Sequence, residues 1–429
     1  MAPAESDRGR TDRRSSGDGG QLGQPNAPKL GPEHELLLCV ARTRAAEAHA
    51  ERARALAHAG VDWASTLMLA LDHGVMPLLH RNFFILGPQA APDRFVRDLR
   101  ALYLANTYRN LSLTAELGRV LALFEADGLP AVAYGGPVLA ALAYGDTALR
   151  QTSVVDVLVG RADLDRAVGI IRGAGYTPRV AVTPGQARRQ ELHAGMLPFA
   201  LADPEVMLNV HWRFGPDAVS AGPEPRAALE NRRREPFGGR TVPSLDPDDM
   251  LLVLVLEGAL GRWRRLVTIC DVAELLQSRD RWEWPGLIGR ASSEGALRML
   301  LLGVSLAAEL LSAPVPQEVL ARAARDPIVA DLRRRAAASL FDRTERGPSY
   351  AAALAFECRV LDTRRASVAY CWRRALVPTP SDWRWLRLPD ALYLVYYLVR
   401  PLRLAVEVVV RPVLRRVLLA FVGTRPAPS

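Results

Sequence analysis

A short apolar run that ends in two glycines places the strongest constraint on how this chain can fold. Residues 129–134 have the length and composition of a buried strand, and Gly135-Gly136 follows directly. Residues 138–142 then resume apolar spacing of three and four, which predicts a helix. Residues 154–159 are apolar except for one carboxylate and predict a second buried strand. A strand, a glycine turn, a helix and a strand in this order indicate an α/β sheet with short connections.

The same texture continues downstream of the second strand. Residues 163–173 have helical spacing and are followed by Gly175, and residues 178–182 and 205–211 have the pattern of strands. Residues 236–242 contain two adjacent glycines between strand-forming residues, which is typical of a hairpin. We therefore expect a β-α-β-α-β-β unit.

Helical patterns lie on both sides of this unit. The fold class expected is α+β or mixed α/β, with a central sheet between helical regions. Asp246-Pro247 followed by two acids is a strong helix start, because Asp caps the helix and Pro fits its first position. The expected domains are a disordered arm over 1–33, a helical region over 34–128, the α/β domain over 129–245, a helical region over 246–348 and a helical C-terminal segment with a basic tail over 349–429.

Composition excludes several classes of protein. The only lysine is Lys29, so a Walker A loop and lysine chemistry are excluded. Residues 364–429 contain twelve arginines and three acids, a net charge of +9 that equals the charge of the whole chain. The rest of the chain is therefore about neutral, and a nucleic-acid-binding surface is not expected. Four cysteines without metal-ligand spacing are typical of buried thiols in a reducing cytoplasm.

Residues 391–422, within this basic C-terminal part, form a segment that could contact a membrane surface or an acidic partner. Residues 391–399 carry no charge but are too short to span a bilayer, which takes about 20 apolar residues. Beyond them, arginines alternate with Leu, Val and Ala and predict a cationic amphipathic helix; these are Arg400, Arg403, Arg411, Arg415 and Arg416. The segment either docks onto the helical region, contacts a membrane surface, or binds an acidic partner. Trp372, Trp383 and Trp385, just upstream, are expected in the core.

The residues that could carry chemistry cluster around the glycine turn. Gly135 and Gly136 would let the backbone approach a triphosphate at a helix N-terminus, or they form only a tight turn. Asp156 on the second strand is a candidate Mg²⁺ ligand, or it caps a helix or pairs with Arg150. Arg150 is a candidate phosphate contact, or an ordinary surface arginine.

Three further residues could line such a site. Asp146 precedes the second strand, and Asn209 and His211 share one face of a later strand because residues two apart on a strand point the same way. His211 is either structural or part of the site. Trp212 is expected to pack. Asp271 in a later helix is expected to contact the α/β domain.

One run of residues carries a family resemblance. Arg150-x-Thr152-x-Val154-x-Asp156 is similar to the R-x-T-x-D-x-D run of nucleotidyltransferase-superfamily proteins, and the chain after about residue 34 resembles the bacterial "uncharacterised nucleotidyltransferase" family. The segments that share its order and spacing are 73–79, 136–140, 163–176, 209–212, 246–252, 263–266, 271–273 and 396–404.

The resemblance implies a function and also shows departures from it. It implies Mg²⁺-dependent transfer of a nucleoside monophosphate from an NTP to an unknown acceptor, with Gly135, Gly136, Arg150 and Thr152 at the nucleotide and Asp156 as catalytic residue and metal ligand. The family pattern has a lysine at Gly135, aspartate at Val154, an acid at Asn209 and a histidine near Glu257. With most carboxylates missing, the alternative is an inactive nucleotide- or partner-binding pseudoenzyme, associated with a membrane surface through its basic tail.

Overall fold

The computed structural model describes residues 30–87, 90–179, 193–203, 205–216, 219, 221–342 and 349–407. The expected arm over 1–33 lies outside them except for its last residues, where the first helix begins. The strands are β1 (Ala131–Ala133), β2 (Val154–Val159), β3 (Thr177–Pro178), β4 (Met196–Leu201), β5 (Val206–His211), β6 (Arg233–Phe237) and β7 (Arg240–Ser244).

Helices account for most of the chain. Up to the sheet they are α1 (Pro32–Val40), α2 (Glu47–Ala59), α3 (Trp63–Asp72), α4 (Met76–Asn82), η1 (Phe83–Leu86) and α5 (Asp93–Ala126). Within the sheet region they are α6 (Gly136–Tyr144), η2 (Thr147–Leu149), η3 (Arg161–Asp163), α7 (Leu164–Gly173) and α9 (Pro225–Glu230).

The remaining helices follow the sheet. They are α10 (Pro247–Leu260), α11 (Leu266–Gln277), α12 (Trp284–Ser293), α13 (Leu297–Leu311), α14 (Gln317–Arg325), α15 (Pro327–Ser339), α16 (Tyr350–Arg359), α17 (Arg364–Leu376), α18 (Pro380–Trp385), η4 (Asp390–Val395) and α19 (Tyr396–Ala405). The predicted start of α10 is confirmed, because the Asp246 side chain accepts a hydrogen bond from the amide of Asp248.

The strands form one mixed sheet in the order β3-β4-β5-β2-β1-β7-β6. The central pair, β2 and β5, is parallel, and β1 runs antiparallel to β2 and parallel to β7. The mixed class expected from the sequence is confirmed. β4 (Met196–Leu201) was not predicted, because its sequence contains a proline and does not alternate between apolar and polar residues. The strand expected over 178–182 begins as β3, and residues 180–192 lie outside the described residues.

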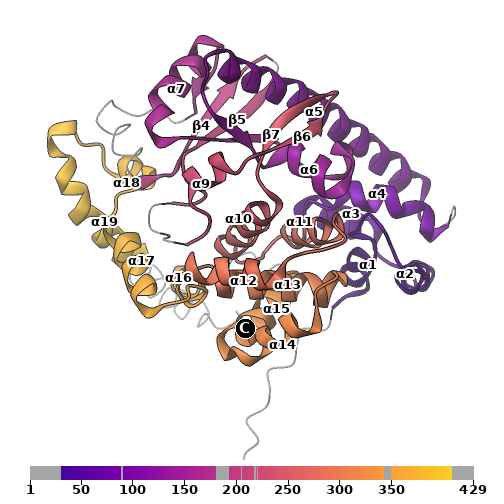
Figure 1. The fold of residues 1–429 in the computed structure, drawn as a ribbon. Coiled ribbons are helices and arrows are strands. Elements are labelled where there is room, and N and C mark those ends of the chain that lie inside the picture. Colours follow the sequence, from indigo (N-terminus) through magenta and orange to yellow (C-terminus); the bar gives the residue numbers. More distant parts are fainter. Residues whose placement is uncertain are drawn as a thin grey trace, which may run out of the picture.

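Each face of the sheet packs against a different set of helices. Val155, Val157 and Val159 of β2 lie in a core with the second half of α5 and with α7. Leu158, on the opposite face, lies in a larger core with α10, α11 and α13. In Figure 1 the sheet accordingly runs between α5 and α7 on one side and α10 and α11 on the other. Because strand residues alternate between faces, Asp156 must lie on the α10–α11 side.

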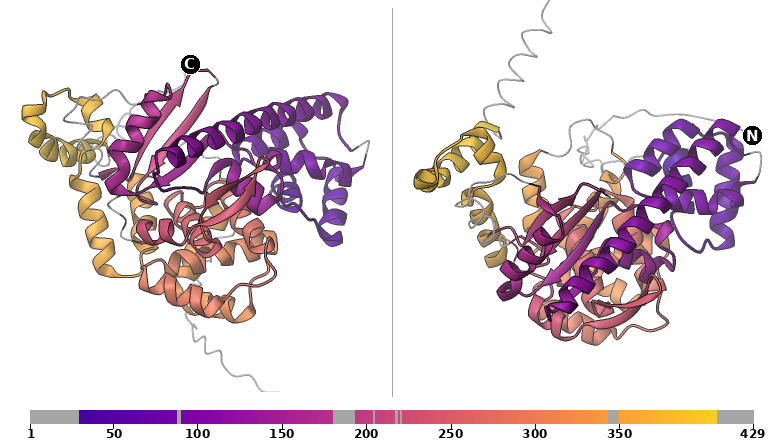
Figure 2. Two further views of the ribbon diagram at one scale, coloured as in Figure 1. Left: turned by 45° about the horizontal axis from the view of Figure 1, so that its top comes forward. Right: turned by 90° about the horizontal axis from the view of Figure 1, so that it is seen from above.

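Helix α5 spans both parts of this arrangement. Its first half packs Phe95 and Leu99 against the N-terminal helices, and its second half packs Leu117 and Phe124 against the sheet. Figure 2 shows this long helix running beside the strands in both views. Asn106 and Asn110 in its middle donate side-chain hydrogen bonds to the carbonyl oxygens of Ala148 and Arg150, which fixes the chain just before β2.

Candidate functional site

Asp156 lies at the centre of a small group of polar side chains on one face of the sheet. The parallel register of β2 and β5 places Asp156 directly beside Asn209 and places Leu158 beside His211. Asn209 Nδ2 donates to Asp156 Oδ1 at 2.9 Å, and His211 Nε2 lies 3.0 Å from the same oxygen. The structure therefore brings together three of the residues singled out in the sequence, although 53 and 55 residues separate them from Asp156 along the chain.

These contacts stabilise the charged form of Asp156. Burial alone would raise the pKa of this carboxyl, but the hydrogen bond and charge of His211, helped by Asn209, lower the pKa below its usual value. Tyr134 keeps the His211 ring in place by an edge-on contact with ring centroids 5.3 Å apart. Asp156 is thus an ionised carboxylate whose Oδ1 is already hydrogen-bonded on two sides.

The glycine pair is required by the close approach of β2. A Cβ atom at Gly135 would overlap Asp156 Oδ2, so the second carboxylate oxygen faces the backbone at the end of β1. Gly136 has φ +52°, and a Cβ atom there would overlap the carbonyl oxygen of Val154. Thr152, which is buried, lies beside Gly136 and donates to the same carbonyl at 3.4 Å. Both glycines therefore have a packing reason that holds whether or not a ligand binds here.

Arg150 is held by the helical region. Its Nε and Nη2 donate to the two carboxylate oxygens of Asp271 on α11, both at 2.8 Å. The Tyr144 hydroxyl at the end of α6 donates to Asp271 Oδ1 at 2.6 Å. The expectation that Asp271 contacts the α/β domain is confirmed. Paired with both oxygens of Asp271, the Arg150 side chain is 16% exposed. Its contact with a phosphate stays a prediction.

Asp146 and Trp212 have structural roles. The Asp146 side chain caps η2 by accepting from the amide of Ala148 at 2.8 Å. Within the described part of the chain, no contact is shown between Asp146 and Asp156. Trp212 is buried against the sheet, as expected, and Arg161 lies over its ring at 5.2 Å.

Glu257 on α10 also lies near Asp156. In the sequence it was noted only as the residue near the place where the family pattern has a histidine. Its side chain reaches solvent, yet surrounding protein desolvates it and, together with the charge of Asp156, raises its pKa to about 8. Glu257 is therefore mostly protonated at neutral pH. Its position on α10 opposite β2 could not be inferred from spacing along the chain.

The donor set does not fit a two-metal centre. Among residues 30–407, leaving aside the stretches the structure does not describe, no group of three His, Cys, Asp or Glu side chains is arranged to hold a metal ion. Asp156 is the one carboxylate of the β2 pattern, since Val154 stands two residues before it and Asn209 stands beside it. Mg²⁺ requires hard anionic oxygens in near-octahedral geometry, which one carboxylate and a carboxamide supply poorly.

Comparison with known proteins agrees with the resemblance found in the sequence. The family model described as "uncharacterised nucleotidyltransferase" matches residues 59–312, which include the sheet, the Asp156 group and α10–α13. No curated protein matches the chain. The matched segment covers more than half of the 429 residues and contains every residue of the candidate site, so the chain belongs to the family of uncharacterised nucleotidyltransferases.

Proposed function

We propose that this protein is a family member that binds a nucleoside triphosphate beside Asp156 without carrying out two-metal nucleotidyl transfer. The observation that supports the proposal is the single carboxylate. Asp156 has a partner amide in Asn209 and an apolar residue in Val154, where the family pattern has acids. Two-metal transfer depends on several anionic oxygens that hold both ions between them. The alternative is an active transferase that moves a nucleoside monophosphate to an unknown acceptor hydroxyl.

Glu257 on α10 is a further carboxyl near Asp156, and burial together with the charge of Asp156 raises its pKa to about 8. It must lose a proton before it can serve as a second anionic ligand at neutral pH. His211 Nε2 is directed to Asp156 Oδ1. Asp156 Oδ2, on the side of the glycine turn, is therefore the carboxylate oxygen that a divalent ion would meet.

Phosphate recognition is supported by the start of α6. The helix begins at Gly136, and the first amides of a helix carry partial positive charge and lack partners within the helix. Thr152, on the segment that leads into β2, lies beside Gly136, and Arg150 in the same segment helps to lower the pKa of Asp156 by its charge. A triphosphate at this place would meet backbone donors and one arginine, and its bound divalent ion would meet Asp156.

Calorimetric titration tests binding. ATP and GTP are titrated into the full chain with and without Mg²⁺, and into the Asp156→Ala variant, with Asp165→Ala on the exposed face of α7 as the matched control. We expect the native chain to bind the triphosphate only with Mg²⁺, because the Asp156 carboxylate repels a triphosphate that carries no divalent ion. This Mg²⁺-dependent binding should be lost in Asp156→Ala and kept in Asp165→Ala. The absence of binding by any NTP to the native chain would refute the nucleotide proposal.

An assay of α-labelled NTP incorporation and of pyrophosphate release tests activity. We expect no turnover by the native chain. Turnover that Asp156→Ala abolishes would show instead an active transferase. The double variant Val154→Asp, Asn209→Asp restores two acids beside Asp156, and we expect it to bind Mg²⁺-NTP more tightly than the native chain.

We also propose that the C-terminal segment contacts a membrane surface. The proposal is supported by the charge of +9 over residues 364–429 and by exposed apolar side chains on α17–α19. None of the helices in the described ranges has the length and hydrophobicity needed to cross a bilayer. Residues 408–422 of the predicted amphipathic helix lie outside the described residues.

A further inference from the structure

The end of η4 and the first part of α19 present three leucines to solvent, whereas α19 turns its arginines toward the protein. Leu394, Leu398 and Leu402 follow one another at spacings of four and are 71%, 74% and 59% exposed. Arg400 and Arg403 are buried on the opposite side, together with Tyr396 and Val399. Arg400 and Arg403 of the expected amphipathic helix therefore face the protein, as in the alternative in which this segment docks onto the rest of the chain. The apolar face is the outer one.

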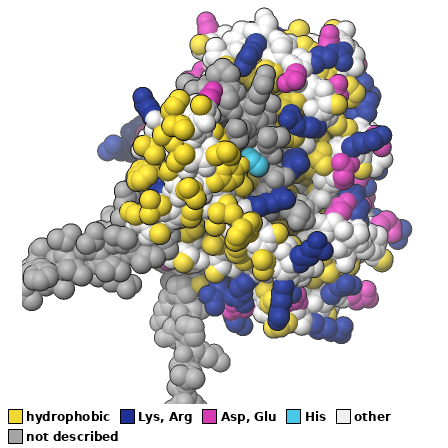
Figure 3. Space-filling view, turned by 90° about the vertical axis from the view of Figure 1, so that its left-hand side faces the viewer, with side chains coloured by type: hydrophobic (Ala, Val, Ile, Leu, Met, Phe, Trp, Pro, Cys, Tyr) yellow, Lys and Arg dark blue, Asp and Glu magenta, His cyan; other side chains and the backbone are white. Residues whose placement is uncertain are grey.

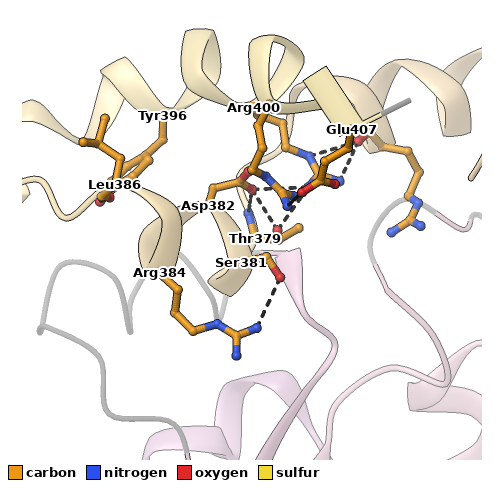
Figure 4. A network of polar contacts seen from close by, with 10 residues as sticks. Thr379, Ser381, Asp382, Arg384, Leu386, Tyr396, Arg400 and Glu407 are labelled. Carbon is orange, nitrogen blue, oxygen red and sulfur yellow. Dashed lines mark hydrogen bonds and ion pairs between the residues drawn. The ribbon is translucent and has the colours of Figure 1, made fainter. Parts of the chain in front are cut away.

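Asp382 explains why the helix has this orientation. Its fully buried carboxylate accepts from Arg403 Nε at 2.6 Å and from Arg400 Nη1 at 3.3 Å. The amide and hydroxyl of Thr379 also donate to it, both at 2.7 Å. Figure 4 shows Asp382, Thr379 and Arg400 converging between α18 and α19. Because a buried carboxylate is costly without such partners, the two arginines are fixed inward. Leu398 and Leu402 each lie two residues from Arg400, about 200° around the helix, and therefore point outward.

The exposed leucines belong to a larger apolar surface. Figure 3 shows hydrophobic side chains gathered on the face of the molecule where α17–α19 lie in Figure 1. The outer leucine face is defined here as Leu394, Leu398 and Leu402, and exposed neighbours on the same segment include Leu392, Val395, Leu386, Trp385, Trp372 and Val368. Soluble proteins rarely expose a contiguous apolar patch of this kind unless it binds something.

Positive charge lies around this face. The exposed arginines are Arg364, Arg365 and Arg373 on α17, Arg384 on α18 and Arg387 just after it. Of the three acids between residues 364 and 407, Asp382 is buried and Glu407 pairs with Arg403 at 2.9 Å. The chain then continues through residues 408–429 with four more arginines, no acid and a predominance of Val and Leu. An apolar surface surrounded by arginine is complementary to anionic lipid.

We infer that the outer leucine face inserts into the headgroup layer of an anionic phospholipid membrane, with α19 lying in the plane of the surface. This inference rests on the proposed membrane contact and names its residues and its lipid class. A row of leucines that projects from the protein is 59–74% exposed, and a bilayer accepts such a ridge without a preformed groove. Trp372 and Trp385, 69% and 51% exposed, are of the residue type that anchors at membrane interfaces.

Vesicle co-sedimentation of the full chain tests the inference. The vesicles contain phosphatidylcholine alone or with phosphatidylserine. The test variant is Leu394→Asp, Leu398→Asp, and the matched control is Leu104→Asp, Leu111→Asp, which changes two leucines on α5 that are 51% and 56% exposed. We expect the native chain to bind phosphatidylserine vesicles on the order of tenfold more tightly than phosphatidylcholine vesicles. The test variant should lose roughly tenfold or more of this binding, while the control keeps it.

The outcomes separate this inference from the membrane contact on which it rests. If the native chain binds neither kind of vesicle, both fail. If the native chain binds and the test variant binds equally well, the membrane contact stands and the outer leucine face is not its site. If the native chain forms a dimer in light scattering that the test variant abolishes, and vesicle binding is absent, the face is covered by a second copy and the inference is overturned.

Discussion

Arg150 Nε and Nη2 donate to the two oxygens of Asp271, which lies 121 residues later in the chain. The pair joins the segment before β2 to helix α11 and also receives the hydroxyl of Tyr144. It therefore fixes how the helical region lies against the face of the sheet that carries Asp156. Because both partners are largely buried, the loss of one leaves the other charge without a partner.

Replacing Asp271 with Asn should lower the free energy of unfolding by about 3–5 kcal/mol, because Arg150 loses its charged partner in a buried place. Urea denaturation of the variant measures this directly. The matched control is Glu230→Gln, which removes the exposed Arg226–Glu230 ion pair and should leave stability nearly unchanged. Equal effects of the two substitutions would contradict the structural role assigned to the Asp271 fork.

Replacing Gly135 with Ala should destabilise the protein by about 1–3 kcal/mol, since the new methyl group would overlap the carboxylate of Asp156. Gly136→Ala should cost at least as much, because its φ of +52° disfavours a side chain as well. Gly169→Ala in α7, where nothing lies within 4 Å of an added Cβ, should be neutral or stabilising. The thermal unfolding midpoints of the three variants measure these effects. An unchanged midpoint for Gly135→Ala would show that the Asp156 carboxylate does not lie against Gly135.

The raised pKa of Glu257 makes a pH-dependent contribution to stability. An acid with a pKa of about 8 in the folded state keeps its proton while the unfolded carboxyl, with a pKa near 4.3, has already lost it. Its contribution is therefore greatest below about pH 4.3 and declines as the pH rises toward 8. Denaturation midpoints measured from pH 5 to 8.5 should fall more steeply for the native chain than for Glu257→Gln. Parallel pH profiles would rule out this protonation state.

Replacing Asp382 with Asn should release α19 from α18, at a cost of about 3–5 kcal/mol to that contact, because Arg400 and Arg403 lose their shared partner. Burial alone would raise the pKa of Asp382, but Thr379, Arg403 and Arg400 lower it. The stability it contributes is thus present above about pH 3.9 and is lost as the pH falls through its lower folded pKa. Hydrogen exchange of residues 379–407 measures the release. Unchanged protection there would contradict the assigned network.

Cys358 and Cys371 are free thiols whose Sγ atoms lie 2.6 Å apart. Oxidised glutathione should therefore join them in a disulfide between α16 and α17, with both thiol hydrogens passing to the oxidant. Burial and the neighbouring Cys371 raise the pKa of Cys358 to about 12, so the reaction should speed up as the pH rises. Peptide mass mapping identifies the bond, and Cys371→Ser is the control. If mapping finds only mixed disulfides with glutathione, the two thiols do not meet.

The sequence predicted those features that depend on local pattern. β2 and its single carboxylate, the glycine turn, the hairpin and the start of α10 all follow from hydrophobic periodicity and capping residues. The grouping of Asp156, Asn209 and His211 was open, because it depends on β2 and β5 being parallel neighbours. Strand order is set by packing between distant segments and leaves no mark in the spacing of residues.

Other features could be inferred only in three dimensions. Trp383 is buried as expected, but Trp372 and Trp385 are exposed, since which side of a short helix faces inward depends on its partner. The same holds for Arg400 and Arg403, whose burial depends on Asp382. Cys39 and Cys270 are buried thiols as predicted, whereas the pairing of Cys358 with Cys371 depends on the crossing of α16 and α17.

The 34-residue length of α5 has a mechanical consequence for the whole molecule. A continuous helix of this size is about 50 Å long and resists bending, so Leu99 among the N-terminal helices and Leu117 against the sheet turn together about one axis. One residue inserted between them would rotate the second by about 100° and carry its apolar side away from the strands. Seven inserted residues would restore the angle to within about 20° but move the sheet about 10 Å along the axis. The number of residues between these two leucines therefore sets both the angle and the distance at which the sheet meets the N-terminal helices.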